Sequence, residues 1–378
     1  MDQVTSSGTD GVILDLRHPA LLERMTAKPD VEVQLASAAR VSGRGCPCQA
    51  HARRTDSSTS VAAAGRSPRI VSNAIEVLEV SVVSRIDVEF PAEGGINLSA
   101  WLYVPGGETP LPAITMAHGY GGTREHGVER FALKFAENGF VVLLHDHRGF
   151  GRSGGEPRQD IDPWQQIKDW RRAISYLESR EEVDADRIGL WGTSYAGGHA
   201  LVLGATDRRL RCVVSQVPTI SGYEQSLRRV TPDLVAVVER TLAEDERAQL
   251  RGEPIRYQAL VSSDPEVLAS YHAPEAIDFY RQSVSVGIWE NKVTIRSTRL
   301  ARMYEPGHWV SRVSPTPLLM VIADDDTLTL TDLELDAYER GLEPKKLVLI
   351  NGGHFEPYLR GFETAAGAAI DWFRSHLA

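Results

Sequence analysis

The sequence is poor in cysteine, with three among its 378 residues. So few cysteines exclude a disulfide framework and fit a reducing compartment. Cys46 and Cys48 form a Cys-Pro-Cys pair with only His51 nearby, which falls short of the four-ligand pattern of a structural zinc site. Cys212 begins an apolar run and is expected in the core. We therefore expect no metal and no cofactor.

The sequence also lacks long apolar runs and an excess of positive charge. No run approaches the length of a transmembrane helix, and no basic segment followed by an apolar one indicates a secretory signal. Lys and Arg total 41 against 51 Asp and Glu, a formal net charge of −10. This balance argues against general binding to nucleic acid or anionic membranes. We expect a cytoplasmic protein with a small-molecule partner, and a homo-oligomer remains open.

Large apolar residues are scarce near the N-terminus. The segment from Gln34 to Arg69 is rich in Ala, Ser, Arg and Gly and shows no sustained periodicity. Such a segment buries too little surface to offset its ordering entropy. We predict that residues 1–75 form a disordered or loosely packed extension without a catalytic part. The alternative is an arm that packs on a neighbouring subunit or over the site.

A regular pattern of strands and helices begins at residue 76. Strands alternating with helices predict an α/β fold, with a mostly parallel sheet that carries helices on both faces. We assign 76–219 and 315–378 to this core. Strands are expected at 77–90, 98–104, 113–117, 140–145, 187–191, 316–323 and 346–350, and helices at 125–138 and 163–179.

The long stretch at 220–314 interrupts this alternation. It far exceeds an ordinary connection and should have structure of its own. We predict a mainly helical cap over one end of the sheet, with helices at 234–250, 265–268, 275–280 and 291–304. Five of its aromatic residues suit either the lining of a pocket or the core of the cap: Tyr223, Tyr271, Phe279, Trp289 and Tyr304.

The stretch from Gly192 to Gly197 predicts a nucleophilic serine. It joins an apolar strand to a segment expected to be helical from Gly198 to about Leu203, and strand, tight turn and helix form the context of a nucleophile elbow at Ser194. The usual elbow has the pattern G-x-S-x-G. Here Ala196 takes the place of the last glycine, a variant that its small size allows. Taken alone, the pattern also fits an ordinary helix N-cap.

An acid and a histidine follow the serine in the required order. Each comes directly after an apolar strand, where open α/β sheets place their chemistry. His354 is expected to take the serine proton and return it to the leaving group, and a carboxylate is expected to orient its ring. Asp324, Asp325 and Asp326 compete for that role. We choose Asp326, because the loop must turn back toward the histidine.

An oxyanion hole is expected from two backbone N–H groups. One belongs to Tyr195, which follows the nucleophile. The other is assigned to Tyr120, in the glycine-rich loop after the strand at 113–117. His118 in the same loop is expected to orient it by hydrogen bonds rather than to act as a base.

These motifs together resemble the α/β-hydrolase superfamily. Within it the chain is similar to the dienelactone-hydrolase and X-Pro-dipeptidyl-peptidase-like groups, most closely at the Ser-Tyr pair of the elbow and the Tyr-Gly-Gly of the oxyanion loop. The resemblance implies a carboxylesterase- or thioesterase-like hydrolase that acts on an ester, thioester or lactone with water. Hydrolysis of a short peptide or amide by the same triad is the alternative. The non-enzyme alternative is a catalytically silent binding protein on the same fold, for which we would expect a damaged triad.

Overall fold

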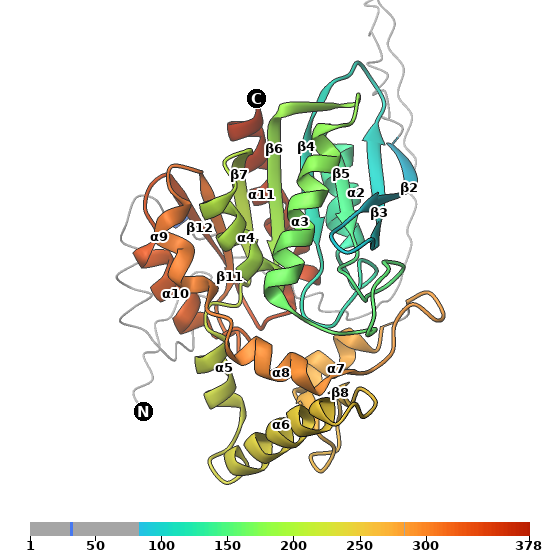
Figure 1. The fold of residues 1–378 in the computed structure, drawn as a ribbon. Coiled ribbons are helices and arrows are strands. Elements are labelled where there is room, and N and C mark those ends of the chain that lie inside the picture. The colour runs from blue at the N-terminus through green and yellow to red at the C-terminus, as the bar shows by residue number, and fades with distance from the viewer. Residues whose placement is uncertain (1–30, 33–82, 283) are drawn as a thin grey trace, which may run out of the picture. The chain divides into compact units, whose positions relative to one another are not determined.

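The computed structural model describes residues 31–32, 83–282 and 284–378 (Figure 1). The chain divides into two compact units. One of them, residues 37–80, lies wholly outside the described residues. The predicted extension at 1–75, with Cys46 and Cys48, falls outside them too, except for the two-residue strand β1 (Val31–Glu32).

A mostly parallel sheet forms the centre of the described part of the chain. Its nine strands lie in the order β1-β12-β11-β7-β6-β4-β5-β3-β2. Only the pairs β2·β3 and β3·β5 in it are antiparallel. The strands besides β1 are β2 (Val83–Pro91), β3 (Asn97–Pro105), β4 (Leu111–Ala117), β5 (Val141–His145), β6 (Val183–Thr193), β7 (Leu210–Gln216), β11 (Leu318–Ala323) and β12 (Lys345–Ile350). This arrangement confirms the predicted α/β fold.

Helices cover both faces of the sheet (Figure 1). α3 (Pro163–Glu178) and α4 (Tyr195–Thr206) pack on one face, and α2 (Glu129–Glu137) and α11 (Phe362–Leu377) on the other. The start of α3 follows from its sequence, since the Asp162 carboxylate accepts the N–H groups of Trp164 and Gln165 and Pro163 needs no such partner. The other helices of the core are α10 (Thr331–Arg340), between β11 and β12, and the 3-10 turn η2 (Glu356–Tyr358), after β12.

The segment between β7 and β11, called the insert below, lies beyond the carboxyl ends of the parallel strands (Figure 1). It holds helices α5 (Gly222–Arg229), α6 (Val235–Leu250), α7 (Pro274–Tyr280) and α8 (Ile295–Arg302). At its end, the 3-10 turn η1 (Pro306–Trp309) and α9 (Val310–Val313) pack against α4. It also holds a three-stranded sheet in the order β10-β8-β9, made of β8 (Tyr257–Val261), β9 (Ala269–Tyr271) and β10 (Val293–Thr294).

Two predictions for the insert were wrong. The expected helix at 265–268 is a turn that leads into β9. The expected helix at 291–304 begins only at Ile295, because the β-branched pair Val293–Thr294 pairs with β8 as a strand. The predictions missed this small sheet because its strands are too short to show a period.

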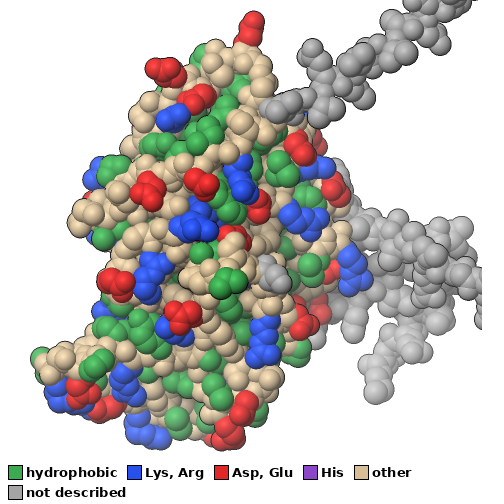
Figure 2. All heavy atoms as spheres, turned by 90° about the vertical axis from the view of Figure 1, so that its right-hand side faces the viewer, with side chains coloured by type: hydrophobic (Ala, Val, Ile, Leu, Met, Phe, Trp, Pro, Cys, Tyr) green, Lys and Arg blue, Asp and Glu red, His purple; other side chains and the backbone are tan. Residues whose placement is uncertain are grey.

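Charge and apolar surface are distributed without large patches on the face that Figure 2 shows, where acidic and basic side chains are interspersed. Within the described residues, no helix combines the length and apolar character needed to cross a membrane. The same residues contain no group of three or more His, Cys, Asp or Glu placed to hold a metal ion.

Candidate active site

Ser194 lies at a sharp turn between β6 and α4. Its backbone has φ 57° and ψ −120°, a strained conformation for a residue with a side chain. The turn requires Gly192, since a Cβ there would lie 2.2 Å from the carbonyl oxygen of Ala196. Ala196 is itself fully buried in the first turn of α4. The alanine variant therefore permits the elbow, and the helix begins at Tyr195, three residues before the predicted start.

Ser194, His354 and Asp326 form one hydrogen-bonded chain. The Ser194 Oγ lies 3.0 Å from His354 Nε2, and His354 Nδ1 lies 2.6 Å from Asp326 Oδ2. Asp326 follows β11 and His354 follows β12, and these strands are parallel neighbours. Parallel neighbours end at the same edge of a sheet, so the two loops meet there.

The Asp326 carboxylate is buried and held by its own loop. Oδ1 accepts the N–H groups of Leu328 at 2.7 Å and Thr329 at 2.8 Å, and Oδ2 accepts the Thr329 hydroxyl at 2.6 Å. Burial raises the pKa of Asp326, but the His354 ring and these hydrogen bonds outweigh it and leave the pKa below its usual value. Asp326 is thus a charged partner for the imidazole.

The other two aspartates have different surroundings. Asp324 Oδ1 accepts the N–H of Gly352 at 2.8 Å, and Oδ2 accepts the Asn351 amide at 3.1 Å. Asp324 therefore ties the two loops together. Asp325 is exposed, whereas Asp326 is buried against the ring.

Two residues behind Asp326 were not predicted from the sequence. The Thr329 hydroxyl also lies 3.1 Å from His354 Nδ1, so it touches both partners. Glu334 of α10 is fully buried, and burial together with the Asp326 charge raises its pKa well above the usual value. Burial and the neighbouring charge thus favour the neutral form of Glu334 beside the Asp326 carboxylate. The position of Thr329, three residues after Asp326, is a local sequence signal that could have predicted its contact with the carboxylate. No local signal predicts where Glu334 lies.

The His118–Gly122 loop passes directly over the nucleophile. A Cβ at Gly119 would lie 2.9 Å from Ser194 Cβ. His118 is neutral, because burial lowers its pKa to about 4. Its Nε2 accepts the N–H of His147 at 3.1 Å, and its Nδ1 donates to the Gly119 carbonyl at 2.9 Å. Both ring nitrogens are thus used to hold the loop.

The insert holds the same loop from the other side. The Tyr280 hydroxyl donates to the Tyr120 carbonyl at 2.6 Å, and the Trp289 indole N–H donates to the Gly121 carbonyl at 2.8 Å. A Cβ at Gly121 would lie 2.7 Å from Leu260 Cδ1 of β8, so the insert also packs tightly here. The backbone of the predicted oxyanion loop is therefore fixed in part by the insert.

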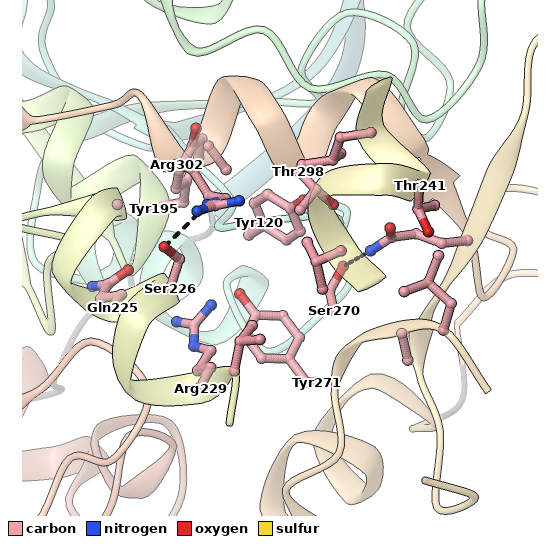
Figure 3. A pocket seen from close by; sticks show the side chains of 18 of the residues that line it. Tyr120, Tyr195, Gln225, Ser226, Arg229, Thr241, Ser270, Tyr271, Thr298 and Arg302 are labelled. Carbon is pink, nitrogen blue, oxygen red and sulfur yellow. Dashed lines mark hydrogen bonds between the residues drawn. The ribbon is translucent and has the colours of Figure 1, made fainter. Parts of the chain in front are cut away.

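A cavity of about 120 Å³ lies between the core and the insert (Figure 3). The side chains of Tyr120 and Tyr195 line it on the core side, and Tyr271 lines it from β9. A separate narrow gap contains Ser194 and His354, and Phe279 of α7 closes it. Ser194 thus lines the narrow gap, and the residue after it, Tyr195, lines the larger cavity.

The remaining aromatic candidates of the insert have structural surroundings. Tyr304 is fully buried, and its hydroxyl lies 2.8 Å from His199 Nδ1. Trp289 holds Gly121, as described above. Tyr223 is half exposed and lies in a different surface hollow, away from the cavity.

Comparison with known proteins places the chain in a family. Residues 94–356 match the family of X-Pro dipeptidyl-peptidases (S15 family). The chain belongs to this family. Its fold is that of the α/β-hydrolases: the crystal structure of the α/β-hydrolase GrgF from Penicillium superposes with a TM-score of 0.69 at 28% identity, covering 78% of this chain and 99% of GrgF. The chain is therefore a hydrolase of this fold.

Two relatives of the chain carry different names. The quorum-quenching protein AidA of Acinetobacter baumannii is 33% identical over 76% of this chain and 94% of its own. The thiohydrolase aneE of Aspergillus aculeatus is 30% identical over 77% of this chain and 93% of its own. Membership of the family thus fixes the fold and the hydrolase class without fixing one substrate.

Proposed function

We propose that this protein hydrolyses a carboxylic ester, thioester or lactone through an acyl-enzyme on Ser194. The observation that carries the proposal is the hydrogen-bonded chain from Ser194 through His354 to Asp326, at a strained elbow beside a cavity. The name of the relative aneE, a thiohydrolase, supports a thioester among the substrates.

The chemistry follows from the geometry. His354 Nε2 takes the proton of Ser194 as Oγ attacks the substrate carbonyl carbon. The N–H groups of Tyr120 and Tyr195 stabilise the negative oxygen that forms, each donor being worth about 3 kcal/mol. His354 then gives the proton to the leaving oxygen or sulfur, and Asp326 stabilises the imidazolium between these steps. Water, activated by His354, releases the acid.

The gap at Ser194 and the cavity at Tyr195 suggest where each half of the substrate binds. The leaving group must lie within reach of His354, because that ring supplies its proton. His354 borders the narrow gap, together with Phe279 and Phe355. The acyl group then takes the cavity lined by Tyr120 and Tyr195.

We assign residues 220–314 to a cap on a hydrolase core formed by 76–219 and 315–378. The cap supplies one wall of the acyl cavity and excludes water from the acyl-enzyme until hydrolysis. The reaction needs no cofactor, and water and a small acyl compound are its reactants. The low cysteine content favours a cytoplasmic location.

The proposal is tested by steady-state and burst kinetics on p-nitrophenyl acetate and butyrate. We expect a burst of at most one nitrophenolate per enzyme molecule, and a loss of about 10⁶-fold in kcat for Ser194→Ala. Ala-Pro-p-nitroanilide serves as the peptide-like substrate and should turn over more slowly. Unchanged ester hydrolysis by Ser194→Ala would exclude the assignment.

A further inference from the structure

The acyl cavity is lined by two arginines that have different partners. Arg302 lies 2.5 Å from a carboxylate oxygen of Glu239 and donates to the Ser226 hydroxyl at 3.2 Å (Figure 3). Arg229 donates one Nη2 bond, of 2.6 Å, to the carbonyl of Leu328. In the described part of the chain no carboxylate forms an ion pair with Arg229. Glu239 compensates the charge of Arg302, whereas the exposed residue Arg229 has no ion-pair partner among the described residues.

Arg229 lies at a defined place relative to the reacting atoms. Its guanidinium is 4.9 Å from the ring of Tyr271, beside which it appears in Figure 3. The Tyr271 ring packs edge-on against the Tyr120 ring, with 6.0 Å between the ring centroids, and the centroids of Tyr120 and Tyr195 are 5.3 Å apart. The row of rings therefore runs from the residue after the nucleophile to the guanidinium along one cavity.

The rest of the lining carries no uncompensated charge. It consists of apolar, hydroxyl and amide side chains and backbone, among them Gln225, Val238, Leu242, Gln258 and Thr298. The lining also contains a polar atom that lacks a partner, because the buried hydroxyl of Tyr195 makes no hydrogen bond. A buried polar group without a partner is costly, and a bound ligand can supply what is missing.

We propose that the acyl group of the substrate carries a carboxylate, which pairs with Arg229 at the far end of the cavity. This inference rests on the proposed acyl-enzyme on Ser194. A guanidinium offers five N–H donors in a planar fork that matches a carboxylate, and the Leu328 carbonyl and the Tyr271 hydroxyl leave some of these donors for a ligand. The substrate class is then a half-ester or half-thioester of a dicarboxylic acid.

The test compares esters that differ only in the terminal group. The substrates are p-nitrophenyl hydrogen glutarate and its neutral counterpart, p-nitrophenyl methyl glutarate, and the measured quantity is the ratio of their kcat/KM values. We expect the wild type to prefer the anion and Arg229→Met to lower the ratio by at least tenfold, since the variant removes the charged hydrogen bonds to the terminal carboxylate.

Arg228→Met is the matched control. Arg228 is the preceding residue, and it is paired with both oxygens of Asp332 at 2.8 Å outside the cavity. This variant removes the same formal charge and should leave the ratio as in the wild type. An equal fall in the ratio for both variants would show a general effect of surface charge and would overturn the proposal.

Two further outcomes would also overturn it. A ratio near one in the wild type that Arg229→Met does not change would mean that Arg229 does not bind the acyl group, while hydrolysis of both esters would leave the proposed function intact.

The anion at Arg229 has an alternative source in a phosphate of the leaving group. Butyryl-coenzyme A and butyryl-N-acetylcysteamine distinguish it: a loss in Arg229→Met confined to the coenzyme A thioester would favour phosphate. Failure of the wild type to cleave any of these compounds would defeat the proposed function and this inference together.

Discussion

At the residue scale, the consecutive aspartates after β11 have different hydrogen-bond partners. Asp326 contacts the imidazole of His354, whereas Asp324 accepts bonds from Gly352 and Asn351. A triad carboxylate fixes the tautomer of its histidine, so that the nitrogen facing the serine is free to accept a proton. An aspartate that only ties two loops has no such effect on proton transfer.

We therefore predict different losses for the two amide variants. Asp326→Asn should lower kcat on p-nitrophenyl butyrate by about 10⁴-fold, because the amide favours the wrong tautomer. Asp324→Asn keeps a hydrogen-bonding side chain at a structural position, and its loss should stay within about tenfold. Equal losses in the two variants, measured side by side with matched thermal stability, would exclude Asp326 as the orienting acid.

The sequence was sufficient to predict which residues meet at Ser194, although their catalytic roles are proposals. Ser194, Asp326 and His354 each follow an apolar strand, and the ends of adjacent parallel strands converge in any sheet of this kind. Arg229 and Glu334 follow no such rule. The fold of the insert brings Arg229 beside Tyr271, and the packing of α10 buries Glu334. Neither placement leaves a local sequence signal.

At the scale of elements, the core was predictable and the insert only in part. Long strands with continuous apolar character and the capped helix α3 have strong local patterns. The strands β8, β9 and β10 have at most five residues each and depend on one another for pairing. These strands make tertiary contacts that the local sequence does not show, because they pack the insert against the loop that passes over Ser194.

The contacts between insert and loop lead to a prediction for Tyr280→Phe. The variant loses the bond to the Tyr120 carbonyl without changing the shape of the ring. When the loop is held loosely, the Tyr120 N–H stabilises the negative oxygen of the transition state less, whereas binding of the ester hardly depends on this bond. We therefore expect kcat to fall by about tenfold with little change in KM.

Tyr223→Phe provides the control, since Tyr223 belongs to the same insert but is half exposed and away from the acyl cavity. Its kcat and KM on p-nitrophenyl butyrate should match those of the wild type. A Tyr280→Phe enzyme with wild-type kcat would show that the insert does not position the oxyanion loop.

At the scale of the whole molecule, five of the six buried histidines among the described residues make the fold sensitive to acid. Burial lowers the pKa of His118 and His126 to about 4. Burial also lowers the pKa of His145 and His199 to about 3, and that of His147 well below its usual value. These rings are neutral in the folded protein and become protonated in the unfolded chain below about pH 6.5.

The free energy of unfolding should therefore fall as the pH falls from about 6.5 toward 4. In this range the unfolded chain binds more protons than the folded protein, and each extra proton contributes about 1.4 kcal/mol per pH unit. The loss stops growing only below the folded pKa values. Urea unfolding at a series of pH values measures this slope.

Single variants assign the slope to the buried rings. His145→Phe should reduce the slope by the contribution of about one proton. His308→Gln, which changes an exposed ring, should leave the slope unchanged. A stability that does not vary between pH 6.5 and 4 would contradict the neutral state of the cluster.

The central claim is that Ser194 is the nucleophile, activated by His354 at the elbow. Labelling with a fluorophosphonate, followed by intact mass and peptide mapping, tests this claim most directly. We predict one adduct per chain, on Ser194, which is absent in Ser194→Ala and forms far more slowly in His354→Ala. An unlabelled wild-type protein, or an adduct that persists in Ser194→Ala, would contradict it.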